Sequence, residues 1–109
     1  MAEKHDRMLA HYRALLVRRG YKIKGRSPFV DYRPDIYATK HALSLFVEGE
    51  IEATLHSKHT LDQLEIMHTY VAQGRQRRGI LLVPRGVAND ARFLIDSVFG
   101  DRCIRVEPW

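Results

Sequence analysis

The stretch PDIYATKHALSLFVEGE, residues 34–50, decides the predicted fold. It contains two strand-like segments, residues 35–39 and 43–52, which are joined by a short turn. In the second segment the odd positions are mostly aliphatic, whereas Glu48 and Glu50 occupy even positions. Side chains alternate between the two faces of a strand, so both carboxylates are expected on the face opposite the aliphatic residues. The two segments are therefore predicted to pair as a hairpin.

Periodicity outside this stretch predicts a mixed α/β fold. Helices are expected at residues 2–19, 60–73 and 87–99, and further strands at residues 21–26, 79–83 and 103–106. The spacing of Thr60 and Gln63 predicts a capping box at the start of the second helix. The order α-β-β-β-α-β-α-β indicates a mixed sheet flanked by helices.

Length and composition limit the classes of protein to consider. A chain of 109 residues with 45% hydrophobic and 28% charged residues suits one globular domain, residues 1–109, and excludes extensive disorder. The single cysteine, Cys103, excludes an intramolecular disulfide and a cysteine-based zinc site. There is no apolar run near the ~20 residues that span a bilayer, and no signal-like N-terminus, so a soluble cytoplasmic protein is expected.

Charge is distributed unevenly along the chain. Residues 1–33 hold nine Lys and Arg against three Asp and Glu, a balance of +6. The balance is −4 in residues 34–70, from two basic and six acidic residues, and +3 in residues 71–109, from seven basic and four acidic residues. An acidic middle between basic ends suits a cation site within a surface that attracts phosphates, although surface charge also fluctuates along any chain.

The acidic residues of the hairpin are candidates for metal binding. Asp35 opens the first strand, and Glu48 and Glu50 lie on the strand predicted beside it. Such carboxylates repel one another unless a divalent cation neutralises them, and Mg²⁺ prefers carboxylate and water oxygens. The alternative is structural, with Asp35 capping a turn and the glutamates lining a solvated strand face.

This arrangement resembles the PD-(D/E)xK nuclease superfamily, which includes many restriction endonucleases and the archaeal-type Holliday junction resolvases. The resemblance is carried by Pro34-Asp35 and by Glu48-Gly49-Glu50. The conserved α-β-β-β-α-β core of these nucleases corresponds to about residues 3–83, followed here by an extra helix and strand. The segment RRGYKI, residues 18–23, is also similar to the small resolvase-like members.

The resemblance implies metal-dependent hydrolysis of phosphodiester bonds. Asp35 and Glu48 would be the ligands of Mg²⁺ or Mn²⁺, together with the carbonyl of Gly49. The ion would activate a water molecule and stabilise charge on the phosphate oxygens. Glu3 corresponds to the place where some members carry an additional acidic residue.

The chain departs from the family motif at Glu50, where the family carries lysine. Glu50 would act as a third carboxylate or a base, or Lys58 would reach the site as a relocated lysine. In a third alternative activity is lost, and the domain only binds nucleic acid or a protein partner.

Two basic clusters are candidates for nucleic-acid binding, because lysine and arginine bind phosphates. The first comprises Lys22, Lys24 and Arg26, and the second comprises Arg75, Arg77 and Arg78. For the second cluster a solvated loop is the alternative.

The sequence therefore predicts a metal-dependent nuclease that acts on DNA, with the catalytic residues Asp35, Glu48, Glu50 and Lys58. The inactive binding domain is the first alternative, and a double-stranded RNA-binding domain, which shares the α-β-β-β-α order, is the second. A homodimer is also considered, with the apolar pair Pro108-Trp109 as a candidate interface.

Overall fold

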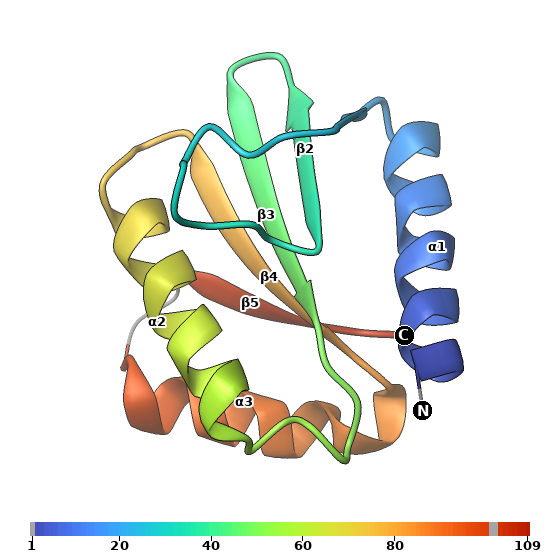
Figure 1. Cartoon of the computed structure of the whole chain (residues 1–109), viewed down its shortest axis with the longest axis vertical. Helices are drawn as coiled ribbons and strands as arrows, with labels where there is room; N and C mark the ends of the chain where they lie inside the picture. Colours follow the sequence, from blue (N-terminus) through green and yellow to red (C-terminus); the bar gives the residue numbers. More distant parts are fainter. Residues whose placement is uncertain (1, 101–102) are drawn as a thin grey trace.

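The computed structural model describes residues 2–100 and 103–109, which form a five-stranded mixed sheet flanked by three α-helices (Figure 1). The helices are α1 (Ala2–Arg18), α2 (Lys58–Ala72) and α3 (Ala88–Val98), the last preceded by the 3₁₀ turn η1 (Arg85–Val87). The strands are β1 (Lys22–Lys24), β2 (Ile36–Lys40), β3 (Leu43–Gly49), β4 (Arg77–Val83) and β5 (Ile104–Pro108). The order of these elements along the chain agrees with the predicted order.

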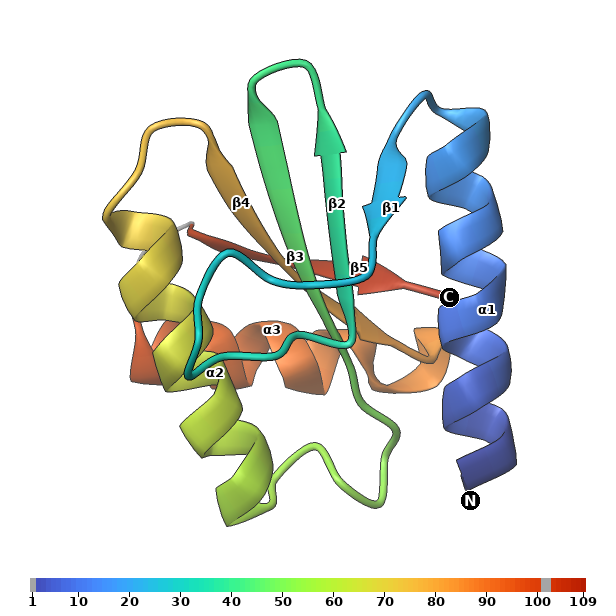
Figure 2. The ribbon, with the colours of Figure 1, turned by 45° about the horizontal axis from the view of Figure 1, so that its top comes forward.

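The sheet has the strand order β1-β2-β3-β4-β5. The first three strands are antiparallel neighbours, and β3, β4 and β5 are parallel. Val47 lies opposite Ile36, so the beginning of β2 lies beside the end of β3. Figure 2 shows the short strand β1 beside α1, with the segment 25–35 passing across the molecule before β2 begins.

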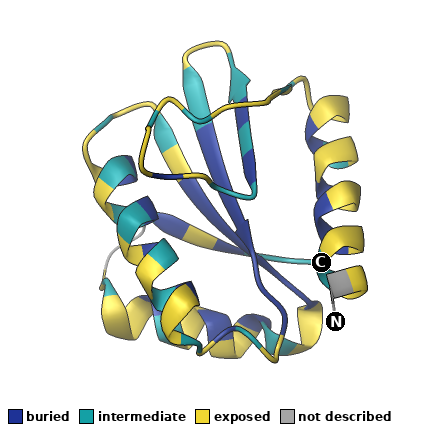
Figure 3. Ribbon diagram, in the orientation of Figure 1, coloured by how far each residue is buried: buried dark blue, intermediate teal, exposed yellow. Residues whose placement is uncertain are grey.

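Helices cover both faces of the sheet, which buries its central strands (Figure 3). Leu45 and Val47 of β3 pack with α1, whereas Phe46 packs with α2 and α3. The alternation continues in β4, where Ile80 faces α1. Both faces of β3 are therefore apolar, and the predicted division into a carboxylate face and an aliphatic face holds only near the end of this strand.

The second helix begins earlier than predicted. Its N-cap is Ser57, whose Oγ accepts a hydrogen bond of 3.1 Å from the Thr60 backbone N–H. The Thr60 hydroxyl is buried and donates to the Thr54 carbonyl at 2.8 Å. The predicted capping box of Thr60 and Gln63 is therefore wrong, because Thr60 lies inside the first turn and its own backbone N–H is capped by Ser57.

The end of the last strand is integrated into the fold. The Trp109 indole N–H donates to His11 Nδ1 at 2.8 Å, and its backbone N–H donates to the Val83 carbonyl at 2.8 Å. The partly buried Trp109 side chain packs against the core beneath α1. Trp109 thus makes contacts within its own chain. These contacts leave less apolar surface at Pro108-Trp109 for the homodimer interface considered above.

Within the described residues, every helix is too short or too polar to cross a membrane.

Candidate functional site

The carboxylates of the hairpin converge in a pocket of about 450 Å³ at the end of β3. Antiparallel pairing brings the beginning of β2 to this end of the sheet, which places Asp35 next to the Glu48-Gly49-Glu50 segment. The wall is completed by α1, by the loop after β3 and by the start of α2. Its lining residues include His5, Asp35, Glu48, Glu50, Thr54 and His59.

Asp35 is held by the backbone of β3. Its Oδ2 accepts a hydrogen bond of 2.9 Å from the Gly49 N–H, which fixes the carboxylate beside the end of the strand. From α1, His5 Nε2 donates to the Gly49 carbonyl at 2.9 Å and lies 3.5 Å from Asp35 Oδ2. His5 therefore bridges two of the groups that the sequence assigned to a metal ion, the Asp35 carboxylate and the Gly49 carbonyl.

Glu48 is buried, with 5% of its surface exposed. Its Oε1 accepts a hydrogen bond of 3.3 Å from the Tyr32 hydroxyl. Burial, followed by the nearby Asp35 carboxylate, raises the pKa of Glu48 from 4.5 to about 8. Burial and the neighbouring Glu48 likewise raise the pKa of Tyr32 above its usual range, so this hydroxyl remains a donor.

Glu50 is also buried, with 8% of its surface exposed. Its Oε2 accepts a short hydrogen bond of 2.6 Å from the Thr54 hydroxyl, and its backbone N–H donates to the Leu82 carbonyl of β4 at 2.9 Å. The strand-like pairing thus continues one residue beyond β3, which directs the Glu50 side chain into the pocket.

The pocket gathers the carboxyl groups of Asp35, Glu48 and Glu50 without a lysine or arginine among its described lining residues. Buried carboxylates are costly unless they are paired, protonated or bound to a metal ion. The donors of Asp35, Glu48 and the Gly49 carbonyl are hard oxygens, so they suit Mg²⁺ or Mn²⁺. Among residues 2–100 and 103–109, no three His, Cys, Asp or Glu side chains are placed to hold one ion. The ligand set expected from the sequence contains only two such side chains, Asp35 and Glu48, together with the Gly49 carbonyl.

Lys58 lies outside the pocket. Its side chain is 92% exposed, and its Nζ lies 3.7 Å from Asp62 Oδ2 on the outer surface of α2. The neighbouring residues Ser57 and His59 line the pocket instead. The structure therefore does not bring Lys58 to the carboxylates. Glu3 is likewise exposed on α1 and absent from the pocket lining described here.

Sequence reasoning missed three polar residues of this site, namely His5, Tyr32 and Thr54. His5 precedes Leu9 by four residues, so helical spacing places it at the edge of the apolar stripe of α1 and facing the sheet. That spacing was a usable signal. Tyr32 and Thr54 lie in irregular segments, where no periodicity indicates which way a side chain points.

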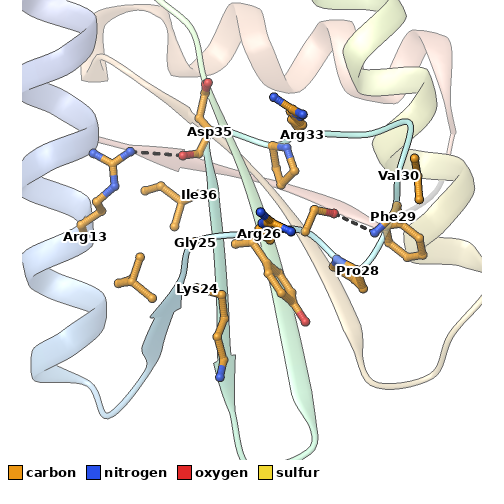
Figure 4. Close-up of a pocket in the computed structure, with 14 residues that line it drawn as sticks. Arg13, Lys24, Gly25, Arg26, Pro28, Phe29, Val30, Arg33, Asp35 and Ile36 are labelled. Atoms are coloured by element: carbon orange, nitrogen blue, oxygen red, sulfur yellow. Dashed lines mark hydrogen bonds between the residues drawn. The ribbon is translucent and has the colours of Figure 1, made fainter.

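The first basic cluster lies close to the carboxylates. A second pocket of about 870 Å³, here called the basic groove, is lined by residues that include Arg13, Lys24, Arg26, Arg33 and Asp35. Figure 4 shows these side chains, with Arg13 reaching from α1 to donate to the Asp35 backbone carbonyl at 3.2 Å. Asp35 lines both pockets, which places the basic groove next to the carboxylate pocket. Lys22 of the predicted cluster is exposed on β1 and is not among the described lining residues.

The second basic cluster lies at the opposite end of the sheet. Arg77 pairs with Ser44 near the start of β3, whereas the carboxylates lie at its end. Arg77 also donates to the Tyr70 carbonyl at 2.8 Å, and its guanidinium lies 5.0 Å from the centre of the Phe29 ring. Arg77 thus supports the fold, while Arg75 and Arg78 are exposed and distant from the pocket along the strand.

Comparison with protein-family models, with curated proteins and with solved structures finds no match to this chain. The functional argument therefore rests on the residues of the two pockets.

Proposed function

We propose that this protein is a metal-dependent nuclease that hydrolyses phosphodiester bonds in DNA, on a restriction-endonuclease-like core. The observation that carries the proposal is the pair of buried glutamates beside Asp35, in a pocket whose described lining has no lysine or arginine and which adjoins a groove lined by arginines and a lysine. A divalent cation would satisfy these carboxylates, and phosphates would bind the neighbouring basic residues.

Asp35, Glu48 and the Gly49 carbonyl are the proposed metal ligands. When bound, Mg²⁺ or Mn²⁺ supplies a water molecule of lowered pKa and neutralises charge on the phosphate oxygens. The Gly49 N–H orients Asp35, and the Tyr32 hydroxyl orients Glu48. These contacts fix the carboxylates in place before substrate arrives, which reduces the reorganisation that the reaction needs.

Glu50 occupies the place of the family lysine and is proposed to accept the proton of the attacking water. The Thr54 hydroxyl holds one of its oxygens, which leaves the other to act as the base. Arg13 and His5 are the basic side chains that contact Asp35, so they are proposed to meet phosphate oxygens.

A second candidate function is a domain of the same fold that binds DNA without cleaving it. It is favoured by the exposed position of Lys58, which leaves the described part of the carboxylate pocket without a lysine. The double-stranded RNA-binding domain has less support, because β4 and β5 are integral strands that its α-β-β-β-α order does not explain.

Hydrolysis assays on the purified chain separate these functions. With Mg²⁺ or Mn²⁺, the wild-type chain is expected to cleave at least one of single-stranded, duplex and branched DNA. The variants Asp35→Asn and Glu48→Gln should lose about 100-fold or more of this activity, since both remove a proposed metal ligand.

Glu65→Gln is the matched control, because it removes an exposed carboxylate of α2 that is absent from the pocket lining. Its activity should equal that of the wild type. Binding of DNA without cleavage in either metal would support the second candidate function, and full activity of Asp35→Asn would refute the proposed site.

A further inference from the structure

The basic groove differs from a scattered basic surface because its cations come from separate elements and face one space. Arg13 belongs to α1, Lys24 to β1, and Arg26 and Arg33 to the two ends of the segment that connects β1 with β2. Arg13 and Arg33 appear in neither predicted cluster, because they are distant from Lys24 in the sequence. The fold brings all four to the wall of one pocket.

These cations are spread along the groove. In Figure 4, Arg13 and Arg33 lie near Asp35, Arg26 lies between the walls, and the Lys24 amine points away from Asp35 at the other end. A small anion would be held by cations that converge on one point. Cations set apart on the walls of a groove instead suit a ligand that carries several phosphates.

The positive charge of the groove is available for a ligand. All four basic residues are exposed, and Asp35 is the one carboxylate among the described lining residues. The exposed Asp31 is not among the described lining residues, and it accepts a hydrogen bond from the Tyr70 hydroxyl. The groove therefore carries a net charge of about +3, four cations against one carboxylate.

The shape of the groove favours one strand over a duplex. The groove is a concave space of about 870 Å³ between α1, β1 and the segment 25–35. A duplex keeps its phosphates on a wide, convex outer surface, and a protein usually meets it with an extended face. Single-strand binders instead combine a charged groove with an aromatic ring, and Tyr37 lines this groove.

We propose that the basic groove binds a single DNA strand through its phosphates and directs it past Asp35 into the carboxylate pocket. The inference rests on the proposed function for the choice of DNA as ligand, and it specifies that a single-stranded segment is the form recognised. Asp35 lines both the groove and the carboxylate pocket, so the two adjoin at this residue.

Equilibrium binding without divalent metal tests this inference separately from catalysis. Fluorescence anisotropy in EDTA would compare a labelled single-stranded oligonucleotide with the duplex of the same sequence over a series of salt concentrations. The test variant is Arg26→Ala/Arg33→Ala. The matched control is Arg75→Ala/Arg78→Ala, which removes the same charge from exposed residues at the other end of the sheet.

The wild type should bind the single strand more tightly than the duplex. The groove variant should weaken single-strand binding by about 10-fold and reduce the slope of log K against log salt by about 1.4, which corresponds to two phosphate contacts. The control should retain most of the affinity and slope. Thermal unfolding of both variants should match that of the wild type, since all four residues are exposed.

Equal or tighter binding of the duplex would overturn the single-strand inference, as would equal losses in the two variants. Neither result would decide whether the protein cleaves DNA in the presence of metal. Conversely, single-strand binding with the expected losses but without cleavage would support the groove and remove the nuclease proposal.

Discussion

Glu48 lies in an environment that favours the neutral acid. It is buried beside the Asp35 carboxylate, and these two effects outweigh the hydrogen bond from the Tyr32 hydroxyl, which lowers the pKa of Glu48. Its pKa is therefore raised to about 8 in the metal-free protein, whereas the unfolded chain would lose this proton near 4.5. Between these two values the native state holds a proton that the unfolded state has released.

This difference predicts how stability changes with pH. In metal-free buffer, the contribution of Glu48 should be fully present below about pH 4.5 and should be lost as pH rises toward 8. At ~1.4 kcal/mol for each pKa unit, the total change is at most about 5 kcal/mol. Chemical denaturation of the wild type and of Glu48→Gln should show the wild type losing stability relative to the variant over this range. Parallel pH profiles for the two proteins would contradict the assigned pKa.

The sequence identified the acidic residues of the site but not their partners. Asp35, Glu48 and Glu50 stand out because carboxylates are unusual at the ends of apolar strands. The contact of His5 with Gly49 joins positions 44 residues apart, and it depends on where α1 lies over the sheet. Lys58, in contrast, is close to Glu50 in the sequence, but its side chain is exposed and lies outside the pocket.

At the scale of elements, Gly49 allows α1 to approach the end of β3. A Cβ atom at this position would lie 2.9 Å from Leu9 Cδ2 and 3.2 Å from Met8 Cε. Both side chains belong to the buried face of α1, with exposures of 5% and 0%. The absence of a side chain at Gly49 is thus a packing requirement of the helix that carries His5.

The substitution Gly49→Ala should therefore destabilise the protein by about 1–3 kcal/mol, because the added methyl overfills this contact. It should also displace His5 from the Gly49 carbonyl. Denaturant unfolding measures the first effect, and the chemical shifts of the His5 ring measure the second.

Gly86→Ala is a suitable control, because a Cβ at Gly86 would meet no atom within 4 Å. Its stability should remain within about 0.5 kcal/mol of the wild type. Equal stability of both variants would show that α1 does not depend on the close approach at Gly49.

The helices and strands were predictable because the order of apolar and polar residues along them reflects which side chains are buried. The apolar spacing of α1 and the uninterrupted apolar run of β4 indicated the helix and the doubly buried strand. The segment 25–35 has no such period, yet it contains the buried Tyr32 and two arginines of the basic groove. The start of α2 was misassigned because Thr60 and Ser57 are both good capping residues, and only the packing of Thr60 against Thr54 separates them.

At the scale of the whole molecule, the fold separates the acidic and basic blocks of the sequence into adjoining sites. The acidic residues of the hairpin gather at the end of β3, and part of the N-terminal basic block forms the groove beside them. The described basic residues of the third block are absent from the lining of both pockets, and Arg78 lies near the start of β4. Charge counts along the chain therefore separated acidic from basic segments but did not indicate which basic block adjoins the carboxylates.

Occupation of the carboxylate pocket by a cation should stabilise the entire fold, because α1, β2, β3 and the loop after β3 all contribute to its wall. A concentration of Mn²⁺ 100 times its dissociation constant should add about 2.7 kcal/mol to the free energy of unfolding. Removal of the ion with EDTA should reverse the gain. Asp35→Asn should lose it, whereas Glu65→Gln should keep it, as measured by denaturant titration. An equal gain in Asp35→Asn would place the ion elsewhere.

The hydrogen bond between Trp109 and His11 joins positions 98 residues apart. Contacts between positions so far apart are slow to form, because the entropy of closing the intervening chain must be overcome before the contact contributes. Docking of α1 on the sheet at this contact is therefore expected to be a late step of refolding, and the apolar face of α1 is expected to stay uncovered until it occurs.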